Sequence, residues 1–149
     1  MRAILKSYQI HDRKVWVADS FEGLPIPDPQ KYPADTGDRL HEFSELAVSL
    51  EQVQSNFAKY DLLDSQVTFL KGWFRDTLPK APIKKLAVIR LDGDMYESTM
   101  DAFVNLYPKL SLAPIIIDKI IFCQRKRIYI CQRVMTLDER RFYQGLELS

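Results

Sequence analysis

The 149-residue chain is poor in cysteine, histidine and glycine. Its two cysteines, Cys123 and Cys131, have no cysteine or histidine near them in the sequence that would complete a zinc-binding set, so we interpret both as reduced thiols. The two histidines, His11 and His41, are interpreted as surface or loop residues. Five glycines are present, and none forms a Gly-x-Gly turn near the start, where a nucleotide-binding loop would be recognised.

The chain also lacks a charge excess and long apolar runs. Lysine and arginine number 21 against 20 aspartates and glutamates, which argues against a protein built for nucleic acid or acidic surfaces. No run approaches the roughly 18 apolar residues of a membrane span, and residues 1–7 hold too short an apolar core for a signal peptide. We therefore expect a cytoplasmic protein with no membrane partner. The hydrophobic fraction of 46% suits a globular core.

Short apolar runs alternate with amphipathic segments along the chain. The alternation predicts an α/β fold with a mainly parallel sheet and right-handed crossovers. Residues 20–46 hold four of the eight prolines and are expected to form a long irregular segment. Strands are predicted at residues 14–18, 66–70, 86–91 and 115–118, and helices at 2–8, 49–60 and 97–110, with a short helical turn before Pro79.

Three of the predicted strands end in an aspartate, namely Asp19, Asp92 and Asp118. The carboxyl ends of parallel strands line the ligand crevice, so Asp92 and Asp118 are expected to face one opening, where paired carboxylates suggest a divalent metal, a base, or both. An acid after an early strand, such as Asp19, commonly binds ribose hydroxyls. The plainer alternatives stay open: Asp92 and Asp94 as turn formers around a glycine, Asp19 as a simple strand end, and Trp73 as a core aromatic.

Three strings narrow these alternatives. They are VWVADSFEGLP at residues 15–25, FLKGWFRDTLP at residues 69–79 and RLDGDMYEST at residues 90–99. Together, and in this order, they resemble the macrocin O-methyltransferase family, whose enzymes use S-adenosylmethionine and a divalent metal to methylate sugar hydroxyls of secondary metabolites. The resemblance covers residues 1–118 and implies a partial Rossmann-like class I methyltransferase fold without its first, glycine-loop strand. It also implies a glycoside as the substrate.

The resemblance assigns roles to residues of this chain. It implies that Asp19, with Ser20, holds the ribose of S-adenosylmethionine and that Gly72 and Trp73 contact the adenine. It implies Asp92 as a metal ligand and general base. A hard cation such as Mg²⁺ lowers the pKa of a bound sugar hydroxyl, so that a nearby carboxylate can accept the proton.

The second metal ligand implied by the resemblance is Asp118. The family places a further acid directly after it, where this chain has Lys119. A cation at that position disfavours metal binding, because like charges a few ångströms apart repel. We therefore expect weak metal binding.

The family pattern continues upstream into a strand and a glycine-rich turn, and this chain begins after them. We therefore expect an incomplete and inactive copy, with a partial methyltransferase domain at residues 1–118 and a divergent basic tail at residues 119–149. Two alternatives remain. One is a non-catalytic fragment that completes its sheet by pairing with another chain, including a second copy of itself. The other is weak nucleic-acid binding through the basic tail, which no recognition motif accompanies.

Overall fold

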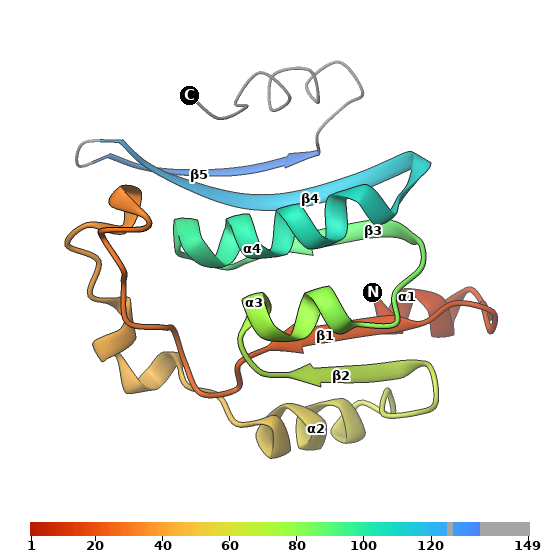
Figure 1. Ribbon diagram of the computed structural model, residues 1–149. Coiled ribbons are helices and arrows are strands. Elements are labelled where there is room, and N and C mark those ends of the chain that lie inside the picture. Colours follow the sequence, from red (N-terminus) through yellow and green to blue (C-terminus); the bar gives the residue numbers. More distant parts are fainter. Residues whose placement is uncertain (125–126, 135–149) are drawn as a thin grey trace. The chain divides into compact units, whose positions relative to one another are not determined.

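The computed structural model describes residues 1–124 and 127–134, and the chain divides into two compact units (Figure 1). The N-terminal unit comprises Met1–Ala81 and the C-terminal unit Pro82–Ser149. The α/β class predicted from the sequence is confirmed. Its strands, however, form two separate sheets, one with the order β1-β2 and the other with the order β3-β4-β5. No helix of the described residues has the length and apolar character needed to cross a membrane.

The sheet of the N-terminal unit consists of two parallel strands, β1 (Val15–Asp19) and β2 (Val67–Lys71). The register runs without interruption from Val15↔Val67 to Asp19↔Lys71, so both strands end at the same edge. This is the edge at which parallel α/β sheets bind their ligands. The helices of the unit are α1 (Arg2–Ser7), α2 (Leu50–Lys59) and α3 (Phe74–Thr77).

Helix α2 begins where the sequence predicts it. The hydroxyl of Ser49 accepts a hydrogen bond from the backbone N–H of Gln52 at 3.2 Å, which satisfies one of the free donors at the helix start. The helix lies beside β2 (Figure 1), and the Phe57 ring packs edge-on against Phe69 with centroids 5.6 Å apart. This aromatic contact joins the helix to the sheet.

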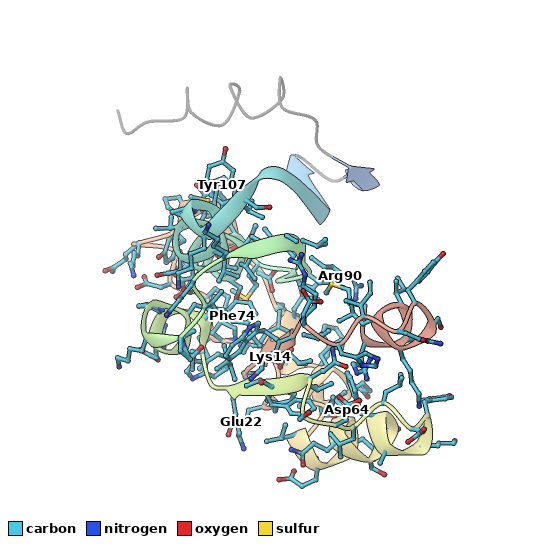
Figure 2. The ribbon with its side chains drawn as sticks, turned by 90° about the vertical axis from the view of Figure 1, so that its right-hand side faces the viewer. Lys14, Glu22, Asp64, Phe74, Arg90 and Tyr107 are labelled. Carbon is cyan, nitrogen blue, oxygen red and sulfur yellow. The ribbon has the colours of Figure 1, made fainter. Side chains whose placement is uncertain are left out.

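A polar cluster fastens α1 to the segment that leads into β2. Arg2 is only 7% exposed, and its guanidinium donates hydrogen bonds to both carboxylate oxygens of Asp64, which is labelled in Figure 2. This hydrogen bonding, more than the charge itself, lowers the pKa of the Asp64 carboxyl. The Gln66 amide donates to the carbonyls of Ile10 at 2.9 Å and Arg13 at 2.7 Å. The start of β1 is thereby held beside the start of β2.

The segment between β1 and α2 is irregular, as predicted. It holds three short 3-10 turns and no longer element. The turns are Pro33–Asp35, Leu40–Glu42 and Ser44–Leu46. Its proline content explains this, because proline lacks the N–H that helices and inner strands require.

The C-terminal unit contains β3 (Leu86–Leu91), α4 (Tyr96–Leu106), β4 (Leu110–Gln124) and β5 (Arg127–Val134). Strands β3 and β4 are parallel, β5 is antiparallel to β4, and α4 lies along the sheet (Figure 1). Side chains that are buried in this unit include Ile83, Ile89, Leu91, Met95 and Ala102.

Two predicted boundaries in this unit are wrong. The helix predicted to reach residue 110 ends at Leu106 and is followed by a 3-10 turn, Tyr107–Lys109, because Pro108 has no N–H to continue the helical bonding. Strand β4 begins at Leu110 rather than at residue 115, and it continues past Asp118 to Gln124. It continues because β5 pairs with it residue for residue from Ile117↔Val134 to Gln124↔Arg127.

The basic tail is only partly covered by the described residues. Arg125, Lys126, Arg140 and Arg141 of the tail lie outside them, so nucleic-acid binding through the tail stays a prediction. The same holds for the domain boundary drawn between residues 118 and 119.

Candidate functional site

The turn that follows β1 is closed by its own hydrogen bonds. Asp19 is exposed, and its carboxylate Oδ1 accepts the backbone N–H of Phe21 at 2.7 Å. Ser20 is only 7% exposed, and its hydroxyl donates to the carbonyl of Gly23 at 2.6 Å and accepts the N–H of Glu22 at 3.1 Å. The turn therefore holds one oxygen of the Asp19 carboxylate in a fixed place.

The backbone of this turn is strained at Phe21. Its φ of 57° lies in the left-handed region, which a bulky residue adopts rarely and at a cost of about 1–3 kcal/mol. The side chain is nonetheless buried, with 5% exposed, and its ring meets Phe69 of β2 edge-on with centroids 6.3 Å apart. Backbone strain that packing maintains is a feature of functional turns. Phe21 was not predicted from the sequence, because an aromatic residue does not signal a left-handed backbone.

The end of β2 is joined directly to the same turn. The backbone N–H of Gly72 donates to the Asp19 carbonyl at 2.9 Å. Gly72 has a φ of 131°, and a Cβ added to it would lie 2.9 Å from Cγ2 of Thr77, so this position requires glycine. Trp73 follows and is half-buried. It lies directly before α3, and its carbonyl accepts both the N–H and the hydroxyl of Thr77, the last residue of that helix. Asp19, Ser20, Gly72 and Trp73 thus lie at one edge, and their role with a cofactor stays a prediction.

An ion pair crosses this edge of the sheet. The ammonium of Lys71, the last residue of β2, lies 3.5 Å from a carboxylate oxygen of Glu22 in the turn. Glu22 is labelled in Figure 2. Both side chains are largely exposed, so the pair contributes about 0–1 kcal/mol. Its effect is local: it balances the Glu22 charge close to the carboxylate of Asp19. This pair was not predicted from the sequence, because it depends on the strand register.

The turn that follows β3 carries the second acid. Arg90, labelled on β3 in Figure 2, donates through Nη2 to Oδ2 of Asp92 at 2.7 Å. The Gly93 carbonyl accepts the N–H of Met95 at 2.6 Å, Asp94 has a φ of 57°, and Met95 is only 1% exposed. A Cβ added to Gly93 would lie within 3.1 Å of atoms at the start of α4, so the turn packs closely on that helix. Turn formation thus rests on Asp94 and Gly93, whereas the Asp92 carboxylate is bound by Arg90.

The third predicted acid lies next to this turn in the register. Asp118 of β4 pairs with Leu91, the residue directly before Asp92. The expectation that Asp118 ends its strand is wrong, because β4 continues beyond it. The parallel register nevertheless places the backbones of Asp92 and Asp118 at the same level of the sheet.

The fit of a divalent cation to these residues is minimal. Mg²⁺ prefers oxygen ligands and is commonly bound by one or two carboxylates together with several waters. Asp92 and Asp118 would supply the carboxylates. The Asp92 side chain is 34% exposed and is paired to the side chain of Arg90, which is 57% exposed. Among the residues that the structure describes, no group of three or more histidines, cysteines or acids is arranged to hold a metal.

The fold and the aspartates at the strand ends define the class of protein. It is a protein with a methyltransferase-like α/β fold. The calicheamicin methyltransferase CalS11 shares this fold, with a TM-score of 0.58 over 79% of this chain and 50% of that chain, at 20% sequence identity. The O-methyltransferase NovP is much more similar, with a TM-score of 0.81 and 46% identity over 100% of this chain and 60% of its own.

The family can be stated more closely. The family model Macrocin-O-methyltransferase (TylF) matches residues 1–133, and the chain belongs to this family. The match extends past Asp118, where the resemblance noted in the sequence ended.

Two curated relatives illustrate the range of the family. The chain is 47% identical to the demethyldecarbamoylnovobiocin O-methyltransferase of Streptomyces niveus, over 96% of this chain and 59% of that protein. It is 52% identical to the mycinamicin III 3''-O-methyltransferase of Micromonospora griseorubida, over 74% of this chain and 44% of that protein. The chain therefore spans roughly half the length of these relatives.

Proposed function

We propose that this chain acts in S-adenosylmethionine-dependent methylation of a sugar hydroxyl on a secondary-metabolite glycoside. The expectation from the sequence that the chain is an incomplete and inactive copy stays a prediction, and the transfer assay below decides between the two. The observation that carries the proposal is the pair of acid-bearing turns after β1 and β3, in a chain that belongs to the macrocin O-methyltransferase family. Relatives named for O-methylation of novobiocin- and mycinamicin-type compounds support the reaction class.

In this proposal the edge formed by β1 and β2 binds the cofactor. The exposed carboxylate of Asp19 accepts hydrogen bonds from the ribose hydroxyls, an interaction that acids at early strand ends commonly make. Ser20 holds the turn, and Gly72 brings the backbone of β2 within hydrogen-bonding distance of Asp19. Trp73 offers an aromatic surface to the adenine. S-adenosylmethionine, when bound there, supplies the methyl group.

The turn after β3 provides the general base that accepts the proton of the sugar hydroxyl. Asp92 would accept that proton, and the carboxylates of Asp92 and Asp118 would hold Mg²⁺. The bound cation would lower the pKa of the hydroxyl. Arg90 must release or share Oδ2 of Asp92 when a cation binds, because both compete for the same carboxylate. Weak metal binding is therefore part of the proposal, as the lysine after Asp118 also suggests.

The acceptor would meet the irregular segment between β1 and α2. This segment exposes several large apolar side chains and begins directly after the proposed ribose-binding acid, and loops in such positions commonly determine specificity. The exposed apolar residues are Ile26, Phe43, Leu46 and Val48. We assign acceptor choice to this segment.

A methyl-transfer assay tests the proposal. The chain is incubated with S-adenosylmethionine, Mg²⁺ and a deoxysugar glycoside, and methylated product is measured by mass spectrometry. Asp92→Asn should lower the rate by about 10²–10⁴-fold, the usual contribution of a general base. Asp94→Asn is the matched control, because it lies in the same turn and asparagine tolerates the left-handed backbone, so its rate should stay near that of the wild type. Equal rates for both variants, or no transfer by the folded wild type, would contradict the proposal.

A second candidate follows from the strand pairing. Among the described residues β1 pairs only with β2, and β3 pairs only with β4 and not with a strand on its other side. Unpaired strand edges invite pairing with another chain. A non-catalytic fragment that pairs in this way would elute as a dimer or complex on gel filtration and show no transfer. A monomer with transfer activity would exclude it.

A further inference from the structure

We propose that Ser20 is a positioning residue for the acceptor, and that it acts by fixing the base of the irregular segment between β1 and α2. The inference rests on the proposed function in one respect, the assignment of acceptor choice to that segment. It goes beyond that function by naming the buried group that holds the two ends of the segment together. It also assigns the Ser20 hydroxyl to the protein itself rather than to the ribose of the cofactor.

The hydrogen bonds of the Ser20 hydroxyl are made within the turn. The hydroxyl donates to the Gly23 carbonyl at 2.6 Å and accepts the N–H of Glu22 at 3.1 Å. A hydroxyl has one proton, so its separation of 3.4 Å from the Asp19 carboxylate is not a second full hydrogen bond. Because Ser20 is only 7% exposed, it presents little surface to a ligand. Its hydroxyl therefore serves to fix the Gly23 carbonyl.

Gly23 is the point at which the segment meets its own far end. A Cβ added to Gly23 would lie 3.4 Å from the Cβ of Ala47, which is ordinary van der Waals contact. Ala47 stands two residues before Ser49, the cap of α2. The two ends of the segment are thus in contact, as in compact loops whose ends lie close together. The bond from Ser20 holds one side of this contact.

The contact at Ala47 sets the place of two exposed apolar side chains. Leu46 and Val48, its neighbours in the chain, are 43% and 44% exposed, whereas the Cβ of Ala47 lies against Gly23. Apolar side chains commonly line sites for small molecules. Release of the base should therefore displace the apolar surface that meets the acceptor. It should leave Asp19 in place, because that carboxylate is held by a separate bond to a backbone N–H.

Ser20→Ala tests the structural step. It removes the donor to the Gly23 carbonyl, so the contact between Gly23 and Ala47 should open. An NOE between an α-proton of Gly23 and the Ala47 methyl group reports this contact; it should be lost in Ser20→Ala and kept in Ser20→Thr, which retains the hydroxyl. Thr36→Val is the matched control, because the Thr36 hydroxyl also donates to a carbonyl at 2.6 Å, that of Pro33 in the same segment. The NOE should persist in that variant.

The kinetic step is tested with nitrophenyl rhamnoside, a deoxysugar glycoside that carries an apolar aromatic group. In Ser20→Ala the KM for this acceptor should rise about fivefold, the factor that corresponds to one neutral hydrogen bond. The kcat should stay unchanged, because contacts made equally in the ground state and the transition state affect KM alone. The dissociation constant for S-adenosylmethionine, measured by calorimetry, should stay within about twofold of wild type. Ser20→Thr should restore the wild-type KM.

Ala47→Gly tests whether Ser20 acts through the contact. It removes the methyl group on the other side of the contact and none of the hydrogen bonds of Ser20. If Ser20 acts through Ala47, the double variant Ser20→Ala/Ala47→Gly should raise KM about as much as either single substitution. Effects on KM that multiply in the double variant would overturn the inference, as would an NOE that persists in Ser20→Ala.

The cofactor affinity separates the inference from a direct role of Ser20 in cofactor binding. A dissociation constant for S-adenosylmethionine that rises as much as KM would overturn the inference, because Ser20 would then act on the cofactor. A folded wild type that transfers no methyl group counts against the proposed function, and the NOE comparison still decides whether Ser20 fixes the base of the segment. The dissociation constant of nitrophenyl rhamnoside then replaces KM, and no binding by the wild type would overturn the inference as well.

Discussion

The turns after β1 and β3 have the same plan and hold their acids by different means. In each, an aspartate at the strand end is followed two residues later by a left-handed residue, Phe21 in the first turn and Asp94 in the second, both with a φ of 57°. In the first turn the carboxylate is bound by a backbone N–H of the turn itself. In the second it is bound by the side chain of Arg90, which is 57% exposed.

The difference matches the ligand proposed for each turn. A backbone N–H is neutral and fixed, so it orients Asp19 and leaves its negative charge available to hydroxyl donors. An exposed arginine is a charged and exchangeable partner, so it can balance Asp92 until another cation arrives. Substitutions in each turn and at the attachment of α1 should lower stability by different amounts, from about 2–5 kcal/mol for a buried side chain to about 1 kcal/mol or less for a partly exposed ion pair.

Truncation of Met95, the buried residue that anchors the second turn, should have the largest effect on stability. Met95 is 1% exposed at the start of α4, and Met95→Ala should lower the free energy of unfolding by about 2–5 kcal/mol, as expected for large-to-small changes in a core. Urea unfolding measures the change. Met100→Ala, at a half-buried position on α4, is the control and should cost clearly less. Equal costs would mean that Met95 does not anchor the turn.

A side chain at Gly72 should have an intermediate effect and should act on the first turn only. Gly72→Ala combines a backbone with a φ of 131° and a contact of 2.9 Å with Thr77 Cγ2, so it should cost about 1–3 kcal/mol of unfolding free energy. Gly37→Ala is the matched control: its φ is 81°, and an added Cβ would meet nothing within 4 Å. A smaller loss of unfolding free energy in Gly37→Ala would show that the contact with Thr77 adds to the cost of the backbone conformation. Equal losses would show that backbone strain alone matters.

The ion pair that fastens α1 should have the smallest effect, and the effect should depend on pH. Arg2 lowers the pKa of Asp64 in the folded state, so the stabilisation is complete well above the unfolded pKa of about 3.9 and is lost as the pH falls through the folded value. Asp64→Asn should therefore be less stable than wild type at pH 7, and the difference should shrink below about pH 4. Stability measured by urea unfolding from pH 7 to pH 2 checks this. A difference that is constant with pH would contradict the assigned pairing.

Much of the fold follows from local patterns in the sequence. The strand at Leu86–Leu91 and the helix capped by Ser49 lie where the apolar run and the capping residues predict them. Both signals are short-range, so they need no knowledge of the rest of the chain. The three motif strings also identified the family that the family model matches.

The remainder depended on pairing between distant segments. Strand β4 continues to Gln124 because β5 provides hydrogen-bonding partners, and no feature of residues 119–124 alone shows this. The strain at Phe21 and the partner of Asp92 likewise depend on packing and register rather than on residue type. The sequence predicted which acids follow the strands, but it could not show how each carboxylate is held.

The most direct measurement is a crossed titration by calorimetry, in which S-adenosylmethionine and Mg²⁺ are each titrated into wild type, Asp19→Ala and Asp92→Asn. We expect Asp19→Ala to weaken S-adenosylmethionine binding at least about tenfold and to leave Mg²⁺ binding unchanged, because only hydrogen bonds to a charged group are lost. Asp92→Asn should have the opposite pattern. Binding of S-adenosylmethionine by Asp19→Ala at the wild-type affinity, or loss of both ligands in both folded variants, would contradict the division of roles between the two turns.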